Sequence, residues 1–179
     1  MTEKEIVALA SKYGAEAAMK RLTDERKAIR KELSKTRLKN IKLLMRNYRD
    51  LKDSVASAVY DAESSETILD IIEDLMMPGR NPNITIESIK RSAVRTAILM
   101  EHVDAEIEAF RYKCSHSRNP KATRQWELVY WLHLADDPKT VEELAGELNC
   151  EKRTLYYDLN AAYETLSALM FGIDGLGGA

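Results

Sequence analysis

The chain has 179 residues, enough for one domain or two small ones, and its formal net charge of -2 excludes a uniformly basic protein. With only seven Gly and four Pro, the composition favours helix almost throughout, so we expect an all-α fold. No apolar run is long enough to span a membrane, and the N-terminus lacks the order of a secretory signal. These features predict a cytoplasmic protein.

The N-terminal part predicts long helices. Residues 15–77 contain neither Gly nor Pro, which favours a long helix followed by a shorter one. We expect a break at 61–65, a second helix over 66–77, a loop at 78–83 and a third helix from about 86 to 112. Apolar residues recur along the first helix at steps of three, four or seven: Met19, Leu22, Ile29, Leu33, Ile41, Leu44, Tyr48, Leu51, Val55 and Val59.

Charge is segregated along these helices. Residues 20–52 carry thirteen Lys and Arg against four acids, whereas residues 61–77 carry six acids and no base. The basic part either pairs with the acidic part or contacts the phosphates of a nucleic acid, since clustered Lys and Arg side chains attract them; that contact would be auxiliary to a separate DNA-binding module. The second interpretation assigns that contact to Arg37, Lys39, Lys42, Arg46 and Arg49.

The apolar stripe of the first helix also allows two interpretations. A single narrow stripe fits packing within one bundle, and it equally fits a second copy of the chain. We expect a homodimer or a higher homo-oligomer.

Polar residues around Pro120 predict a linker over 115–123. It divides the chain into a helical N-terminal region, 1–114, and a C-terminal domain, 124–171, followed by a flexible glycine-rich tail, 172–179. The C-terminal domain should begin with a support helix that carries Trp126, Val129, Tyr130, Leu132 and Leu134.

Residues 140–160 have the spacing of a helix-turn-helix, whose second helix enters the DNA major groove. Thr140 and Glu143 can form a capping box, and Asn149 suits a turn position with positive φ. The inner face should carry Leu144, Leu148, Cys150, Leu155 and Leu159. The outer face of the second helix should present side chains that reach phosphates or base edges: Lys152, Arg153, Thr154, Tyr156, Tyr157 and Asn160.

Two considerations weigh against DNA binding by this module. Short amphipathic helix pairs also occur in proteins that never contact DNA. Between Asp136 and Asp158 there are seven acidic residues and three basic ones, so the module alone should bind phosphates weakly. The missing positive charge would have to come from the N-terminal helix.

Motifs for catalysis are missing from the sequence. It contains no Gly-rich phosphate loop and no nucleophile elbow, and its carboxylates are scattered over polar faces. Cys114 and Cys150 are expected to be free thiols, and the spacing of Cys and His does not suggest a zinc site. We therefore expect neither an enzyme nor a cofactor or metal.

Two segments resemble known families. Residues 37–52, together with 58–61, resemble the N-terminal signature of ArpU-like phage regulators, and residues 140–159 resemble the region-four helix-turn-helix of sigma factors. The resemblance covers about residues 37–61 and 124–171. It implies sequence-specific binding to double-stranded DNA near phage or prophage late promoters, with contact to RNA polymerase, and it places the recognition role on Lys152, Arg153, Thr154, Tyr156 and Tyr157.

Two alternative functions fit the same pattern. A small terminase subunit, which packages phage DNA, also joins a helix-turn-helix to an oligomerising helical region. A module that docks on RNA polymerase without touching DNA would explain the acidic character of the C-terminal domain.

Overall fold

The computed structural model describes residues 3–56 and 93–172, and every regular element within these ranges is a helix. The all-α expectation is therefore confirmed for this part of the chain. The helices are α1 (Glu3–Arg46), α2 (Tyr48–Ala56), α5 (Ala93–Ser115), α6 (Pro120–Val129), the π-helix η1 (Tyr130–Leu134), α7 (Val141–Glu147) and α8 (Lys152–Phe171). Within the described ranges, none of them has the length and apolar character to cross a membrane.

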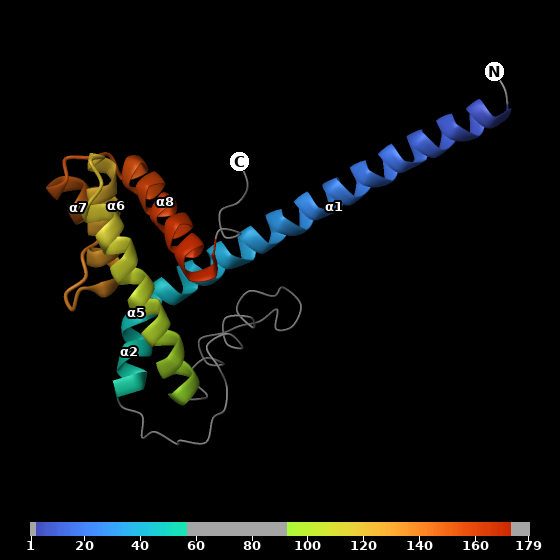
Figure 1. Ribbon diagram of the computed structural model, residues 1–179. Coiled ribbons are helices and arrows are strands. Elements are labelled where there is room, and N and C mark those ends of the chain that lie inside the picture. The colour runs from blue at the N-terminus through green and yellow to red at the C-terminus, as the bar shows by residue number, and fades with distance from the viewer. Residues whose placement is uncertain (1–2, 57–92, 173–179) are drawn as a thin grey trace.

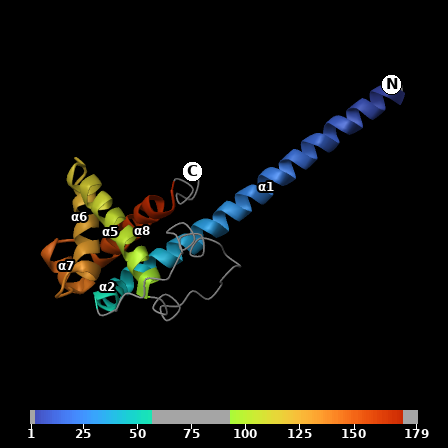
Figure 2. The same cartoon turned by 60° about the horizontal axis from the view of Figure 1, so that its bottom comes forward.

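Helix α1 projects away from the other helices, as both cartoon views show (Figures 1 and 2). Every side chain from residue 11 to residue 32 is exposed. Only the last turns of α1 enter the body of the protein, where Ile41, Leu44 and Met45 are buried. The apolar stripe predicted for this helix is therefore covered at its C-terminal end and open along the projecting part.

The first helix ends at Arg46 and Asn47 forms a turn, well before the break that the sequence predicts at 61–65. The Asn47 side chain donates to the carbonyl oxygen of Leu43 at 2.8 Å, and such local bonding by Asn competes with the helical backbone pattern. Helix α2 follows at once, and it packs on α5 through a hydrogen bond of 2.7 Å from the Tyr48 hydroxyl to Asp104. The sequence prediction of one continuous helix through this point is wrong, because the Gly and Pro pattern carries no signal at Asn47.

Several predictions concern residues outside the described ranges. They are the break at 61–65, the helix over 66–77, the loop at 78–83, the acidic segment 61–77 and the tail beyond residue 172. The third predicted helix is described from Ala93 onward and ends at Ser115.

The predicted linker is shorter than expected, because α6 already begins at Pro120. The Asn119 side chain accepts a hydrogen bond from the Lys121 backbone N–H at 3.0 Å, and Pro120 occupies the first turn, where its missing N–H does no harm. The support helix predicted around Trp126 consists of α6 and the η1 turn that continues it.

One hydrophobic core joins both predicted regions. Its buried members come from α1, α2, α5, α6 and α8, with Phe110 of α5 and Leu166 of α8 among the most deeply buried. Figure 1 shows α8 lying alongside the end of α1 and α5. The C-terminal half of α8 thus holds the helix-turn-helix to the N-terminal region, so the two ranges do not have separate cores.

Candidate nucleic-acid interface

The start of the helix-turn-helix has the predicted cap. Thr140 Oγ1 accepts from the Glu143 backbone N–H at 3.2 Å, and the Glu143 carboxylate accepts from the Thr140 backbone N–H at 2.7 Å. The bond from the Thr140 backbone holds the pKa of Glu143 below its usual value. Asn149 has a φ of 48°, which confirms the predicted left-handed turn residue.

A small apolar cluster fixes α7 and α8 against α6. Leu128 of α6, Leu144 of α7 and Leu155 of α8 are buried together, and Ala145 and Cys150 pack around them. Both cysteines are free thiols. Of the predicted inner face, Leu144 and Leu155 are therefore buried, and the remaining members pack against them half-buried: Leu148, Cys150 and Leu159.

The predicted outer face of α8 is exposed at all six positions: Lys152, Arg153, Thr154, Tyr156, Tyr157 and Asn160. The Arg153 guanidinium donates to the Tyr157 hydroxyl at 3.0 Å and lies 5.6 Å from the centre of its ring. Lys152 instead pairs with Glu142 of α7, with 2.5 Å between Nζ and Oε1. Arg153 is thus held on the surface by a phenol hydroxyl, whereas the partner of Lys152 is a carboxylate.

The basic end of α1 meets the outer face of α8 at one point. Lys42 Nζ donates to Asn160 Oδ1 at 2.8 Å and lies 5.7 Å from the centre of the Tyr163 ring. Lys39 and Arg46 are exposed on the same helix, three residues before and four residues after Lys42. Since residues at this spacing share one face of a helix, the three cations form a basic strip beside α8.

The other two predicted auxiliary residues do not belong to that strip. Arg37 is only 5% exposed, and its Nε and Nη1 atoms have no hydrogen-bond partner, so it does not present its charge at the surface. Arg49 is half-buried and donates to the carbonyl oxygen of Ala135 at 3.1 Å, which ties α2 to the end of η1. Arg37 and Arg49 are therefore poorly placed for the auxiliary DNA contact that the sequence assigned to them, because the packing of α1 and the turn at Asn47 direct both side chains into the protein.

The surface of the helix-turn-helix carries fewer unpaired acidic side chains than the number of acidic residues in its sequence suggests. Asp158 of α8 is 2% exposed and pairs with two cations of α6: Arg124 at 2.9 Å (Nε) and Lys121 at 3.3 Å (Nζ). Glu147 pairs with Lys139 at 2.7 Å. Lys121 and Arg124 were missed from the sequence, where nothing links them to a carboxylate more than thirty residues away.

A second buried polar contact lies under the interface. The ring Nε2 of His133, in η1, is 2.6 Å from the Tyr163 hydroxyl of α8. Burial, aided by the charges of Arg49 and Arg46, lowers the pKa of His133 to about 4, and burial raises the pKa of Tyr163 to about 12. Both groups are neutral near pH 7, so this contact is a neutral hydrogen bond that joins the support helix to α8.

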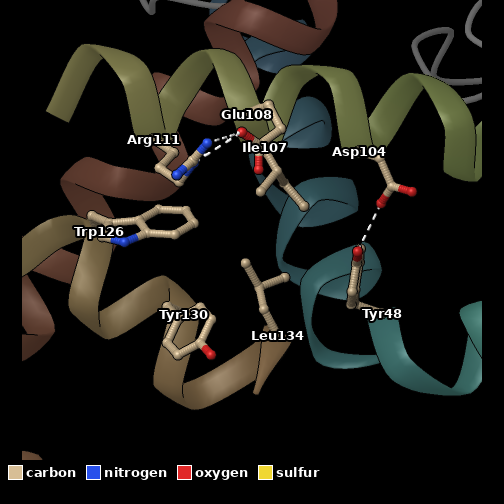
Figure 3. A pocket seen from close by; sticks show the side chains of 8 residues that line it. All are labelled: Tyr48, Asp104, Ile107, Glu108, Arg111, Trp126, Tyr130 and Leu134. Carbon is tan, nitrogen blue, oxygen red and sulfur yellow. Dashed lines mark hydrogen bonds and ion pairs between the residues drawn. The ribbon is translucent and has the colours of Figure 1, made fainter. Parts of the chain in front are cut away.

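Figure 3 shows the depression between α2, α5, α6 and η1. Four of its polar side chains bond in pairs, Tyr48 to Asp104 and Arg111 to Glu108, the second pair at 2.7 Å. Trp126 and Tyr130 form the opposite wall. Among the described residues, no group of three or more His, Cys, Asp or Glu lies close enough to hold a metal ion.

Comparisons with protein-family models, with curated proteins and with solved structures found no match to this chain.

Proposed function

We propose that this protein is a sequence-specific double-stranded DNA-binding regulator of phage or prophage late transcription, with the outer face of α8 in the major groove. The observation that carries the proposal is the exposed face of α8, held outward by a buried apolar cluster on its opposite side. An α-helix fits the width of the major groove, and its exposed polar side chains can reach base edges there.

The spacing on α8 supports readout by a single helix face. Arg153, Tyr156, Tyr157 and Asn160 follow one another at steps of three, one and three, so they lie on the same side. Arg153 is our candidate for a bidentate contact to guanine, the commonest specific contact in the major groove. Its bond to Tyr157 limits the conformations of the guanidinium before DNA arrives.

The basic strip Lys39–Lys42–Arg46 supplies phosphate contacts in this proposal. It lies beside α8, as the Lys42–Asn160 bond requires, so the same duplex can touch both helices. Internal pairing of Asp158 also removes one carboxylate from the phosphate-facing surface. Proposed partners are duplex DNA, RNA polymerase and a second copy of the chain, in the cytoplasm of a bacterial host.

The test starts by selecting bound sequences from a random duplex pool and measuring affinity by fluorescence anisotropy. Arg153→Ala should weaken binding to the selected site by about 1–3 kcal/mol and relax the preference at one base pair. Arg111→Ala removes the same charge from the surface of α5 and should leave both quantities unchanged. Absence of salt-sensitive binding to any duplex would overturn the proposal.

A small terminase subunit is a second candidate function. The projecting helix α1 favours it, since such proteins oligomerise through helices. Light scattering separates the two functions, because a ring of many copies favours packaging and a dimer favours regulation. A docking module for RNA polymerase would retain polymerase in a pull-down while binding no DNA.

A further inference from the structure

The projecting part of α1 exposes large apolar side chains. Met19 is 66% exposed, Leu22 is 50% exposed and Ile29 is 60% exposed. Most helices in proteins owe their stability to the packing of an apolar face, and an isolated helix gains little without it. Figures 1 and 2 show no other described helix alongside this part of α1.

The exposed stripe continues a face that is already buried. Leu33 is half-buried, and Leu44, eleven residues further along the same face, lies in the core. The stripe follows a seven-residue repeat from residue 15 to residue 36, in which positions a and d line one seam. Position a holds Met19, Arg26 and Leu33, and position d holds Ala15, Leu22, Ile29 and Thr36. This repeat is the pattern that lets two helices pair along their length.

Charges beside the seam select the direction of pairing. Within residues 15–36, position g holds Ala18, Glu25 and Glu32, and position e holds Glu16, Thr23 and Arg30. In a parallel pair, each g position faces the e position five residues later on the other helix, so Glu25 faces Arg30 of the partner subunit. In an antiparallel pair, g faces g and e faces e. The acidic residues at g would then repel each other next to the seam, and the attraction left at the e positions would need Glu16, at the outer end of the segment, to face Arg30. The described part of the chain contains no ion pair that already uses Glu25 or Arg30.

We propose that residues 15–36 of α1 form a parallel, in-register, two-stranded coiled coil with the same segment of a second copy. This interface specifies how the second copy named in the proposed function would bind, but the interface itself does not require DNA binding. Arg26 is the one charged residue at an a position. Such a residue lowers the stability of the pair and fixes its register, while its long side chain extends toward water.

The orientation has a consequence for the rest of the molecule. A parallel pair brings both helix-turn-helix bodies to the same end of the coiled coil. An antiparallel pair would separate them by the length of the paired segment, about 33 Å for 22 residues. Only the parallel arrangement sets two α8 faces side by side for neighbouring half-sites on DNA.

Analytical ultracentrifugation of the full chain tests the interface. We expect a dimer, and we expect the double variant Leu22→Asn/Ile29→Asn to raise its dissociation constant about a hundredfold. Tyr13→Asn is the matched control, because Tyr13 is 61% exposed but lies off the seam, and this variant should remain dimeric. A wild-type chain that stays monomeric over a wide concentration range, or forms larger rings, would overturn the proposal.

Charge reversal tests the direction of pairing. Glu25→Lys and Arg30→Glu should each raise the dissociation constant about three- to tenfold, and the two changes together should restore it. In an antiparallel dimer, Glu25→Lys would relieve repulsion and strengthen the pair. Ultracentrifugation needs no DNA, so the dimer can still be measured if the protein fails to bind DNA. A chain that binds DNA as a monomer would refute the coiled coil and leave the proposed function standing.

Cysteine cross-linking gives a second measure of direction. In a Cys150→Ala background, where the remaining Cys114 is buried, Leu22→Cys should form a disulfide-linked dimer on mild oxidation. Asp24→Cys points away from the seam and should cross-link much more slowly. Equal rates for the two variants would contradict parallel pairing. So would efficient bonding only between a Leu22→Cys chain and a Leu33→Cys chain, since an antiparallel pair sets position d against position a.

Discussion

Lys42 near the end of α1 and Asn160 on the outer face of α8 are joined by a hydrogen bond of 2.8 Å, although 118 positions separate them in the chain. The bond places the basic helix and the proposed recognition helix on one surface. A duplex lying in contact with α8 would therefore also approach Lys42 and the neighbouring cations of the basic strip.

This arrangement predicts the effect of removing the Lys42 charge. Lys42→Gln should weaken binding to the selected site and to unrelated duplexes by the same factor, because a phosphate contact carries no sequence information. The slope of log affinity against log salt should become shallower by about one. A loss confined to the selected sequence would instead make Lys42 a base contact.

Tyr157 should affect the affinity for DNA indirectly, by holding the side chain of Arg153 in place. Tyr157→Phe removes the hydroxyl that accepts the 3.0 Å bond from the guanidinium while keeping the ring. We expect a loss of about 0.5–1.5 kcal/mol, less than for Arg153→Ala, with relaxed preference at the same base pair. Anisotropy on single-base variants of the site measures this. Relaxation at a different base pair would show that Tyr157 reads DNA by itself.

The buried carboxylate of Asp158 should matter more for stability than for binding. Asp158→Asn leaves Arg124 and Lys121 without the negative charge of their partner, so the free energy of unfolding should fall by about 3 kcal/mol. Urea unfolding followed by circular dichroism provides the measurement.

Glu147→Gln is the control for that experiment, since it removes an exposed pair with Lys139 and should cost less than about 1 kcal/mol. If Asp158→Asn proves as mild as Glu147→Gln, the α6–α8 ion pairs do not hold the motif together.

The contrast between Thr140 and Asp158 explains which features could be predicted. The capping box of Thr140 and the turn at Asn149 depend on residues within one or two turns, so local spacing suffices to find them. The exposed face of α8 could be predicted in the same way, because the spacing of apolar residues along the helix shows which side is buried.

The partners of Asp158, the burial of Arg37 and the approach of Lys42 to Asn160 depend instead on how α1, α6 and α8 pack. A count of charges along the chain cannot separate an exposed acid from one neutralised inside the fold. The end of α1 at Asn47 escaped prediction for a related reason, because a single Asn inside an apolar period is compatible with a continuous helix.

The His133–Tyr163 contact predicts a pH dependence of stability. The pKa of His133 is about 4 in the folded protein and near 6.5 in the unfolded chain. Between these values the unfolded state binds the proton and the folded state does not, so stability falls as the pH drops from about 6.5 to about 4. The total loss through this window is of the order of 3 kcal/mol.

Urea unfolding at several pH values checks this for the wild type and for His133→Gln. Carboxylates such as that of Glu143 also titrate at the acidic end, so the informative quantity is the difference between the two proteins. That difference should shrink as the pH falls through the window, because His133→Gln has no imidazole to protonate on unfolding. His116→Gln changes an exposed histidine instead and should keep the wild-type slope, since His133 is still present. Parallel curves for wild type and His133→Gln would mean that the imidazole of His133 is protonated as readily in the folded protein as in the unfolded chain.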